Sequence, residues 1–369
     1  MQEPIRVLML FTIMDKGGAE TMIMNYYRII NRAKVQFDFV VHRSKPGAYD
    51  EEIRQLGGKI YVFPPVHPLQ FGKYKAQISQ FLDEHPEYKI IHSHCQELSY
   101  YFYKIAHQKG IPYIITHSHN ASMLLDFKAP LRIWWRKMMF RYINIYFTCG
   151  IEAGKHYYGV KRAKKAILMR NAIDVDRFRF NLEWRIEKRK EFRVNDDWFV
   201  IGHVGRFSLQ KNHSLILKIF KAFTNKYPTS LLVLVGEEDS EHAIRTKAER
   251  LGIIDKVRFM GSRSDIPQLL SGFDCILMPS LFEGVSVAMI EEQASGVPLI
   301  TSTNVPKEVG LLPSTEFHSL NADVNEWVDA IAKYRKIPRI ANAGEIITKA
   351  GYDIRTNANW LQEYYLSLR

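Results

Sequence analysis

The sequence predicts an α/β protein made of two successive units, each with a parallel sheet covered by helices. Three observations support this. The chain has 369 residues, about the length of two ordinary domains. Short apolar runs rich in β-branched residues alternate with segments of helical periodicity. This alternation starts again near residue 199, after a charged stretch at 174–197. We therefore place an N-terminal domain at 1–175 and a C-terminal domain at 176–355.

Each element of the first domain follows from its local pattern. Short apolar runs predict strands at Val7–Ile13, Phe37–Val41, Ile60–Phe63, Ile90–His92, Tyr113–Thr116 and Ile145–Thr148. Apolar residues at helical spacing predict helices at Glu20–Ile30, Ala76–Asp83, Leu98–Gln108 and Leu131–Tyr142.

The second domain repeats this organisation. Its predicted strands are Phe199–Val204, Leu231–Val235, Val257–Met260, Cys275–Met278 and Leu299–Thr301. Its predicted helices are His213–Asn225, Ala243–Leu251, Val287–Ala294 and Glu326–Tyr334. A last helix within 356–369 could pack on either domain, including back on the N-terminal one.

Composition narrows the class of protein. Hydrophobic residues make up 46% of the chain and charged residues 24%, which is typical of a folded protein. No apolar run approaches the roughly 18 residues of a membrane-spanning helix, and the N-terminus lacks a secretory layout. Three widely spaced cysteines give neither a disulfide framework nor a zinc finger. We therefore expect a cytoplasmic protein.

The charge is concentrated in the first half of the chain. The net charge is +11 over residues 1–175 and +1 over 176–369, and residues 128–170 hold 11 basic residues against one acid. This asymmetry predicts an anionic partner, for which nucleic acid, a membrane surface and phosphorylated ligands are candidates. No nucleic-acid recognition module is present, so we expect no nucleic acid partner.

Ligands of parallel sheets bind beyond the carboxyl ends of the strands, and two groups in the first domain lie there. Gly17 and Gly18 follow the first strand and open the first helix, where glycine permits a close approach to an anionic ligand. His92 and His94 end one strand, and His117 and His119 end the next. Residues two apart in a strand share a face, so each pair could bind a metal or hydrogen-bond a polar substrate. No carboxylate accompanies the pairs, which favours the substrate.

Two groups of charged residues mark the corresponding edge of the second domain. Gly205 and Arg206 follow its first strand, with Lys211 five residues later, and such a pair of cations suits a diphosphate. Glu283 follows the strand Cys275–Met278, and Glu291 lies in the next helix. Between them, the backbone amides of Gly284, Val285 and Ser286 lie at a helix N-terminus. A site that has cations to bind phosphates and carboxylates to bind hydroxyls favours a phosphorylated sugar as its ligand. A glycoside hydrolase would explain the carboxylates but not the cations.

These motifs resemble the retaining glycosyltransferases of family 4, which have the GT-B fold of two Rossmann-like domains with doubly wound parallel sheets. The resemblance rests on Gly205-Arg206 through Lys211, Glu283 through Glu291 and Gly296-Val297-Pro298, with support from 17–20 and 171–174. It covers nearly the whole chain. More narrowly, the chain resembles bacterial exopolysaccharide-type members of this family.

The resemblance implies a role for each matching residue. Arg206 and Lys211 would hold the donor diphosphate and stabilise the departing charge, as a metal does elsewhere. Glu291 would bind the nucleotide ribose, and Glu283 would lie near the donor sugar. Gly17 and Gly18 would approach the donor phosphates and the acceptor. His117 and His119 compete for the role of the family's functional histidine.

The resemblance also implies the reaction and its partners. A sugar would pass from a nucleotide diphosphate sugar to a saccharide or lipid-linked acceptor, with retained configuration and by a front-face route. Asp174 and Asp176 form a DxD sequence, the metal motif of another glycosyltransferase fold, but they occupy an interdomain turn. We therefore expect no metal and no cofactor. The alternatives are another GT-B enzyme, such as a nucleotide-sugar epimerase or a synthase with a soluble acceptor, and a non-catalytic, membrane-associated scaffold.

A basic, aromatic helix predicts contact with an anionic membrane. The segment 128–142 combines Arg132, Arg136, Lys137 and Arg141 with Trp134 and Trp135. Basic residues near an anionic surface gain about 1 kcal/mol each, and tryptophan suits the headgroup zone. An ordinary covering helix is the alternative. The expected location is therefore the cytoplasm, with peripheral association at the inner face of the plasma membrane.

Overall fold

A computed structural model describes residues 3–65, 70–119, 129–237 and 240–368. The chain divides into two compact units, which are Met1–Ala172 together with Ile354–Arg369, and Ile173–Asp353. The first boundary thus follows residue 172, where the sequence suggests 175. The last helix, α14 (Ile354–Leu366), belongs to the N-terminal unit.

The N-terminal unit is built on a parallel sheet. Among the described residues it has seven strands in the order β3-β2-β1-β4-β5-β6-β7. Their bounds are β1 Ile5–Leu10, β2 Val35–Val41, β3 Ile60–Val62, β4 Ile90–Ser93, β5 Tyr113–Ser118, β6 Ile145–Thr148 and β7 Ile167–Leu168. β1 lies between β2 and β4, so the chain first builds outward on one side and then on the other. This doubly wound order brings the carboxyl ends of β1, β4 and β5 together at one edge.

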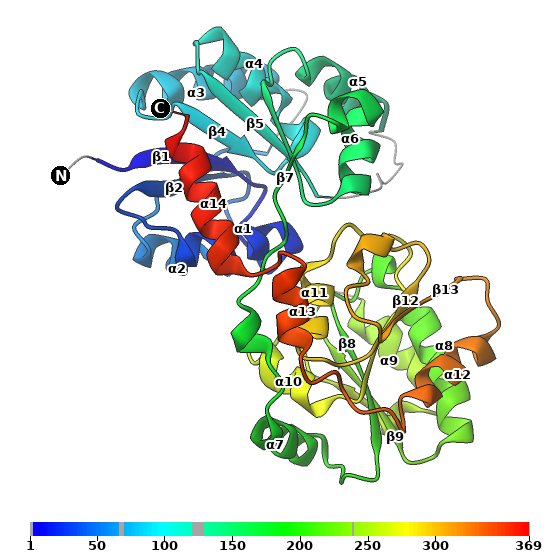
Figure 1. Cartoon of the computed structure of the whole chain (residues 1–369). Coiled ribbons are helices and arrows are strands. Elements are labelled where there is room, and N and C mark those ends of the chain that lie inside the picture. The colour runs from blue at the N-terminus through cyan, green and yellow to red at the C-terminus, as the bar shows by residue number, and fades with distance from the viewer. Residues whose placement is uncertain (1–2, 66–69, 120–128, 238–239, 369) are drawn as a thin grey trace. The chain divides into compact units, whose positions relative to one another are not determined.

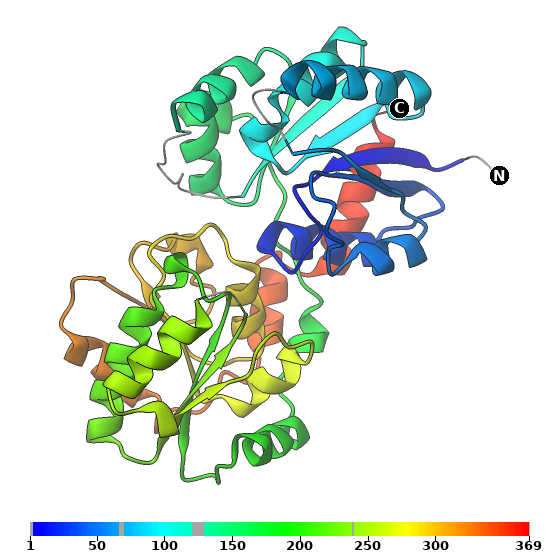
Figure 2. The same ribbon diagram turned by 180° about the vertical axis from the view of Figure 1, so that it is seen from behind.

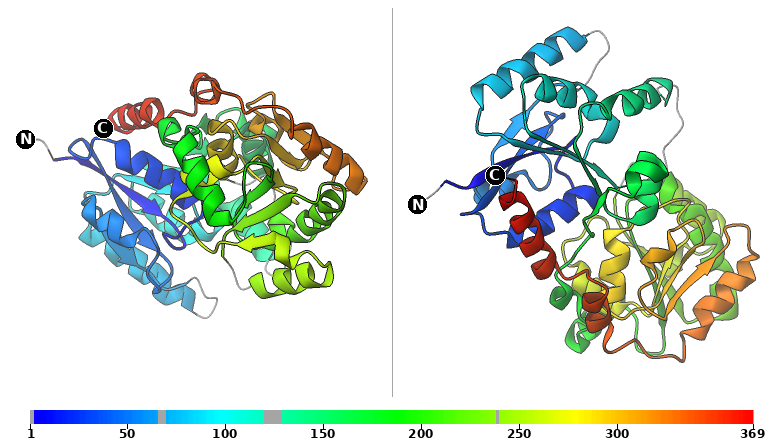
Figure 3. Two further views of the ribbon diagram at one scale, coloured as in Figure 1. Left: turned by 90° about the horizontal axis from the view of Figure 1, so that it is seen from below. Right: turned by 45° about the horizontal axis from the view of Figure 1, so that its top comes forward.

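Helices cover both faces of this sheet. They are α1 Gly18–Ile29, α2 Asp50–Gln55, α3 Phe71–Glu84, α4 Tyr100–Gln108, α5 Ala129–Met139, α6 Ile151–Ala163 and α14. One face, with Leu8 and Leu10 of β1, packs against α3, α4 and α5 (Figure 2). The other face carries α1 and α14, which lie side by side (Figures 1 and 3). There the ring of Tyr365 meets Phe37 of β2 edge-on at 5.9 Å.

The C-terminal unit has the same architecture. Its described residues form a six-stranded parallel sheet in the order β10-β9-β8-β11-β12-β13. The strands are β8 Phe199–Val204, β9 Ser230–Val235, β10 Val257–Phe259, β11 Cys275–Met278, β12 Leu299–Ser302 and β13 Thr315–His318. β8 and β11 are neighbours, although more than seventy residues separate them in the chain. Their loops therefore meet at the carboxyl edge.

The helices of this unit also lie on two faces. They are α7 Leu182–Phe192, α8 His213–Lys226, α9 Glu241–Arg250, α10 Ile266–Gly272, α11 Val287–Ala294, α12 Val324–Lys333 and α13 Ala343–Lys349. α8, α9 and α12 share one core with the sheet, built around Phe220 and Trp327 (Figure 1). α11 packs against α13, and α10 packs against α7.

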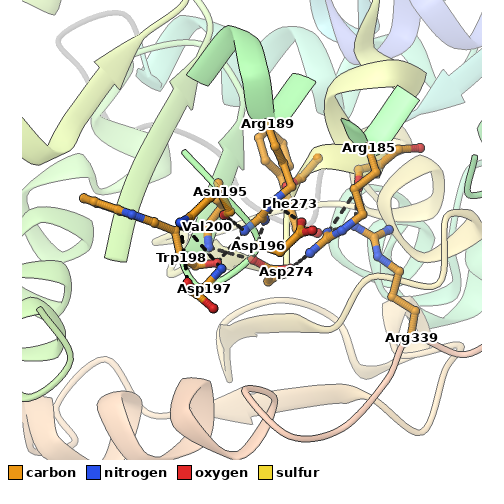
Figure 4. Close-up of polar contacts among 12 residues, drawn as sticks. Arg185, Arg189, Asn195, Asp196, Asp197, Trp198, Val200, Phe273, Asp274 and Arg339 are labelled. Carbon is orange, nitrogen blue, oxygen red and sulfur yellow. Dashed lines mark hydrogen bonds and ion pairs between the residues drawn. The ribbon is translucent and has the colours of Figure 1, made fainter. Parts of the chain in front are cut away.

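A polar network anchors α7 at the amino end of β11 (Figure 4). The Asp274 carboxylate accepts hydrogen bonds from Arg185 at 2.7 Å, from Arg189 at 3.0 Å and from the Val200 amide at 2.8 Å. The Arg339 guanidinium donates to the Phe273 carbonyl beside it, and burial lowers the pKa of Arg339 to about 9. A cavity of about 860 Å³ adjoins this network. The arginines that line this cavity already contact other groups of the protein. The cavity lies at the end of the strands opposite to the predicted ligand edge.

Several elements escaped the sequence analysis for identifiable reasons. These elements are β7, β13, α2, α6, α7, α10 and α13. β7 has two residues, too few to show a pattern. α6 contains Gly159 with φ 74°, a kink that interrupts its periodicity. α7 lies where the sequence suggests a charged linker, because most of its residues are charged and only Lys188, Arg189 and Phe192 are buried.

Candidate active site

The loop that leaves β8 begins with a close approach of two backbone segments. The Gly205 amide donates to the Val235 carbonyl at 2.9 Å, which ties the loop to the end of β9. A Cβ atom on Gly236 would lie 2.0 Å from the Gly205 carbonyl oxygen, so only glycine fits there. The chain then forms a short 3₁₀ turn at Leu209–Lys211 and enters α8 through Asn212, whose φ is 54°. This loop places Arg206 and Lys211 at the carboxyl edge of the sheet.

Lys211 and Glu283, predicted from separate motifs, are in direct contact. The Lys211 Nζ atom lies 2.7 Å from Glu283 Oε1. Gln210 Nε2 donates to the other carboxylate oxygen at 3.1 Å, and the Leu281 amide donates to the Gln210 carbonyl at 2.8 Å. Glu283 is buried, whereas Arg206 is exposed. The Lys211 ammonium is thus held against the Glu283 carboxylate, whereas Arg206 is exposed to solvent.

The helix α11 brings Glu291 to the same edge. Ser286 is its N-cap residue and makes no side-chain capping bond, so the first backbone amides have no cap from that hydroxyl. Gly284 and Val285 are buried just before it. Glu291 is partly buried, five residues after the cap. A helix N-terminus favours anionic groups, which suits the phosphate chemistry expected here.

Sequence reasoning missed Glu292, the neighbour of Glu291. Its side chain is 1% exposed, and neither carboxylate oxygen has a hydrogen-bond partner among the described residues. Burial raises the pKa of Glu292 well above its usual value; Lys211 acts against this rise, and Glu291 and Glu283 add to it. Burial therefore favours the neutral form of this carboxyl, next to the Lys211–Glu283 contact. The signal that could have revealed Glu292 is its position in the helix, because it lies on the buried side of α11 with Met289 and Gln293.

Two buried histidines beneath the Arg206 loop were also missed. The rings of His203 and His213 meet edge-on at 4.8 Å, and His203 Nδ1 lies 2.9 Å from the Leu277 carbonyl. Burial, followed by the charge of Lys211, lowers the pKa of His213 to about 4. Burial also lowers the pKa of His203 well below its usual value, so neither ring is expected to add positive charge beside Lys211.

The glycine pair at the start of α1 has two different environments. A Cβ atom on Gly17 would lie 2.2 Å from the Glu20 carboxylate, which folds back over that residue. Nothing lies within 4 Å of the corresponding position on Gly18. The open space lies at Gly18, which is also the exposed member of the pair. Of the two, Gly18 therefore offers its backbone to a ligand more directly.

The four predicted histidines of the N-terminal unit form one cluster. The rings of His117 and His119 stack at 4.2 Å, and those of His92 and His94 stack at 4.6 Å. Across the two strands, His94 Nδ1 lies 2.8 Å from His119 Nε2. His117 is fully buried and His119 is partly buried. Of the two residues left open by the sequence, His119 is the more accessible.

Burial keeps this cluster neutral. It lowers the pKa of His92 and of His119 to about 3, and it lowers those of His94 and His117 well below the usual value. The mutual repulsion that two imidazolium groups would feel adds to this effect for His92, His94 and His117. The four imidazoles therefore stay uncharged throughout the physiological pH range.

The predicted membrane face of α5 needs two corrections. Trp135 is 5% exposed and packs against Tyr100 and Phe71, so it belongs to the core and is wrong as a membrane-facing residue. The Arg136 guanidinium lies over the Tyr157 ring at 4.3 Å, with its Nε atom 4.0 Å from Glu97. Arg136 is thus held inward and does not share an exposed basic face.

The rest of that segment reaches solvent. Trp134 is 49% exposed, and Leu131 and Ile133 are exposed beside it. Lys137 and Arg141 are exposed, Arg132 is partly buried, and Lys128 lies outside the described residues. None of the helices in the described part of the chain has the length and apolar character that crossing a bilayer requires.

Asp174 and Asp176 flank the start of a short 3₁₀ turn, Val175–Phe178. Asp176 accepts a hydrogen bond from Arg179 at 2.9 Å, three residues later. This contact gives the second aspartate a local structural partner.

Comparison with known proteins identifies the family. The family model for Glycosyltransferase Family 4 matches residues 16–177, and the model for group 1 glycosyl transferases matches residues 185–350. The putative glycosyltransferase EpsF of Bacillus subtilis (strain 168) is 32% identical, over 98% of this chain and 96% of its own length. The chain belongs to glycosyltransferase family 4.

Two further proteins are similar to this glycosyltransferase, one in sequence and one in fold. An Escherichia coli UDP-Gal:alpha-D-GlcNAc-diphosphoundecaprenol alpha-1,3-galactosyltransferase is 26% identical over 58% of each chain. The crystal structure of HepE from Anabaena, in complex with UDP-glucose, superposes with a TM-score of 0.81 at 20% identity, covering 98% of this chain and 99% of that one. The expected GT-B architecture of two parallel-sheet α/β units is confirmed.

Proposed function

We propose that this glycosyltransferase moves a sugar from a nucleoside diphosphate sugar to a saccharide acceptor, with retention of anomeric configuration. Arg206, Lys211, Glu283 and Glu291 lie on the loops and helix that follow β8 and β11, two adjacent strands of one sheet. HepE, which has the same fold, is described in complex with UDP-glucose, and this supports a donor of that class.

The donor diphosphate would be bound by the two cations without a metal. Arg206 is exposed and offers a planar fork of donors. Lys211 is held at 2.7 Å from Glu283, so its ammonium is oriented before a ligand arrives. As the sugar–phosphate bond breaks, negative charge grows on the leaving diphosphate, and pre-placed cations stabilise it without reorganisation. This is the role that a bound divalent metal fills in other transferases.

The carboxylates would hold the neutral parts of the donor. Glu291 would accept hydrogen bonds from the ribose hydroxyls, and Glu283 would accept one from a sugar hydroxyl while it pairs with Lys211. The backbone amides of Val285 and Ser286 lie at the start of α11 and would face the phosphates. Burial raises the pKa of the neighbouring Glu292 and so disfavours a further negative charge that would repel them.

Retention would follow from a front-face transfer. The acceptor hydroxyl attacks the anomeric carbon from the side of the leaving group, and the departing phosphate oxygen takes the hydroxyl proton. The new glycosidic bond replaces the sugar–phosphate bond, and nucleoside diphosphate is released. Holding both substrates together supplies much of the rate. Of the two candidate histidines we propose His119, the more accessible one, as the residue that contacts a substrate hydroxyl.

A lipid-linked acceptor in surface or exopolysaccharide synthesis fits the relatives and the charge of the chain. The E. coli relative is named for a diphosphoundecaprenol-linked substrate. The exposed apolar residues of α5, together with Lys137 and Arg141, form a surface suited to an anionic bilayer. We propose that this surface docks on the inner face of the plasma membrane.

Vesicle sedimentation tests the docking surface. Wild-type protein is expected to pellet with anionic vesicles at low salt and to be released by high salt, because each basic residue contributes about 1 kcal/mol near the surface. Changing Lys137 and Arg141 to Gln and Trp134 to Ser should weaken the binding. The matched control is Lys190→Gln with Arg193→Gln, two exposed basic residues of the other unit, which should leave it unchanged. Equal binding by both variants contradicts the assignment of this surface.

A screen of the purified protein against nucleotide sugars tests the proposed donor. A ligand that binds only the folded state raises the melting temperature. When the free ligand concentration is a hundred times Kd, the free energy of unfolding rises by about 2.7 kcal/mol. We expect one nucleoside diphosphate and its sugars to stabilise the protein, and the corresponding nucleoside alone to do so far less. Stabilisation by none of the nucleotide sugars would overturn the proposal.

A further inference from the structure

We propose that the N-terminal unit binds a divalent transition-metal ion of the zinc class on His92, His94 and His117. This inference departs from the expectation that the protein needs no metal. It concerns a different unit from the Arg206 and Lys211 site and does not rest on the proposed function.

The strand register brings the three side chains together. β4 and β5 are adjacent and parallel, with His92 paired to Ile115. His94 follows β4 two residues after His92, and His117 lies two residues after Ile115 in β5, so the three rings gather at one edge. Their nearest ring nitrogens all lie within 4.8 Å of one another. Two nitrogens bound to one tetrahedral zinc, each at about 2.0–2.1 Å, are roughly 3.4 Å apart. Binding one ion would therefore require these nitrogens to move closer together by up to about 1.4 Å.

The cluster contains buried nitrogens that no described group satisfies. These atoms are His92 Nε2, His94 Nε2 and both ring nitrogens of His117. Leaving a buried polar atom without a partner normally costs free energy, so native structures rarely contain several together. One ion bound by three of these atoms would remove most of that cost.

Contacts of the Nδ1 atom orient two of the three histidine rings. His92 Nδ1 lies 2.6 Å from the Tyr365 hydroxyl of α14, and His94 Nδ1 lies 2.8 Å from His119 Nε2. When each Nδ1 donates its proton to these partners, each Nε2 carries a free lone pair. Metal-binding histidines commonly have their second nitrogen held in this way, which fixes both the tautomer and the ring.

The ligand chemistry selects the metal. An all-imidazole set suits zinc and its neighbours, whereas magnesium and calcium require oxygen ligands. No carboxylate or thiol belongs to this group among the residues described. Three protein ligands leave the fourth position of a tetrahedral ion to water.

Bound zinc would connect the ends of β4 and β5 and, through Tyr365, the helix α14. The experiment uses the full chain, stripped with chelator, reloaded with zinc chloride and desalted, with zinc measured per chain. Wild type should retain about one ion and gain in melting temperature. The double variant His94→Gln, His117→Gln should lose both effects.

His42→Gln is the matched control. His42 is buried in the same unit, but both its ring nitrogens have partners, the Phe11 carbonyl at 3.0 Å and the Tyr74 hydroxyl at 2.7 Å. It should retain zinc and the gain in melting temperature. Zinc retained equally by the double variant, or not retained by wild type, overturns the proposal and leaves ordered water or a polar substrate as the partner of these nitrogens.

Cobalt substitution gives a readout that does not depend on a variant folding. Wild type loaded with Co²⁺ should show the intense visible absorption of a four-coordinate ion, and excess zinc should abolish it. Only the weak absorption of six-coordinate cobalt would contradict a buried three-histidine site.

Discussion

Replacing Arg206 or Lys211 with alanine is expected to lower turnover of the donor by about 10²–10³-fold while the protein stays folded. The reason is the charge that develops on the leaving diphosphate, which these two cations would stabilise. Arg206 is exposed, and its loss removes no contact of the described residues that holds the loop. A steady-state assay of nucleoside diphosphate release measures the effect.

The two substitutions should differ in stability. Lys211→Ala leaves the buried Glu283 with Gln210 as its remaining side-chain donor, so its melting temperature should fall more than that of Arg206→Ala. Lys218→Ala is the matched control, because Lys218 is an exposed lysine on the helix that follows the loop. Near-normal turnover in both site variants would remove these cations from the mechanism.

Glu291→Ala and Glu283→Ala are expected to separate nucleotide binding from sugar transfer. Glu291→Ala should weaken the binding of free nucleoside diphosphate and of the nucleotide sugar alike, by roughly tenfold or more, because both ligands carry the ribose. Glu283→Ala should lower turnover strongly but hold or increase affinity for the free nucleotide. The ammonium of Lys211, now paired with Glu283 at 2.7 Å, would then be released to the phosphates.

Calorimetric titration of the nucleoside diphosphate, combined with the turnover assay, distinguishes the two roles. Glu326→Ala, a change at an exposed acid on α12, should alter neither quantity. If both site variants lose the same nucleotide affinity, the separate assignment to ribose and sugar is wrong.

The sequence predicted where the candidate site residues lie in the fold better than it predicted their contacts with one another. Gly205, Lys211 and Glu283 lie where strand ends were expected, because the alternation of apolar runs and turns marks each strand locally. The ion pair between Lys211 and Glu283 joins residues 72 apart in the chain, and it depends on the adjacency of β8 and β11. No local sequence pattern indicates that these two strands are adjacent.

The rotation of a helix is equally hard to predict from sequence. Trp134 and Trp135 are neighbours with the same chemistry, yet one is 49% exposed and the other 5%. The difference arises because Trp135 packs on Tyr100 and Phe71, residues from α4 and α3. Glu292 shows the converse. Charged side chains usually lie in solvent, but the carboxyl of Glu292 is buried together with most of α11.

The anomeric configuration of the product tests the proposed front-face transfer most directly. The donor identified by the nucleotide-sugar screen is incubated with the protein and an acceptor, or with water alone if no acceptor is known, and the first-formed sugar product is observed by NMR. A front-face transfer gives the same anomeric configuration as in the donor, together with release of the nucleoside diphosphate. A product of inverted configuration would contradict the assignment of Arg206, Lys211 and Glu283 to a front-face, retaining transfer.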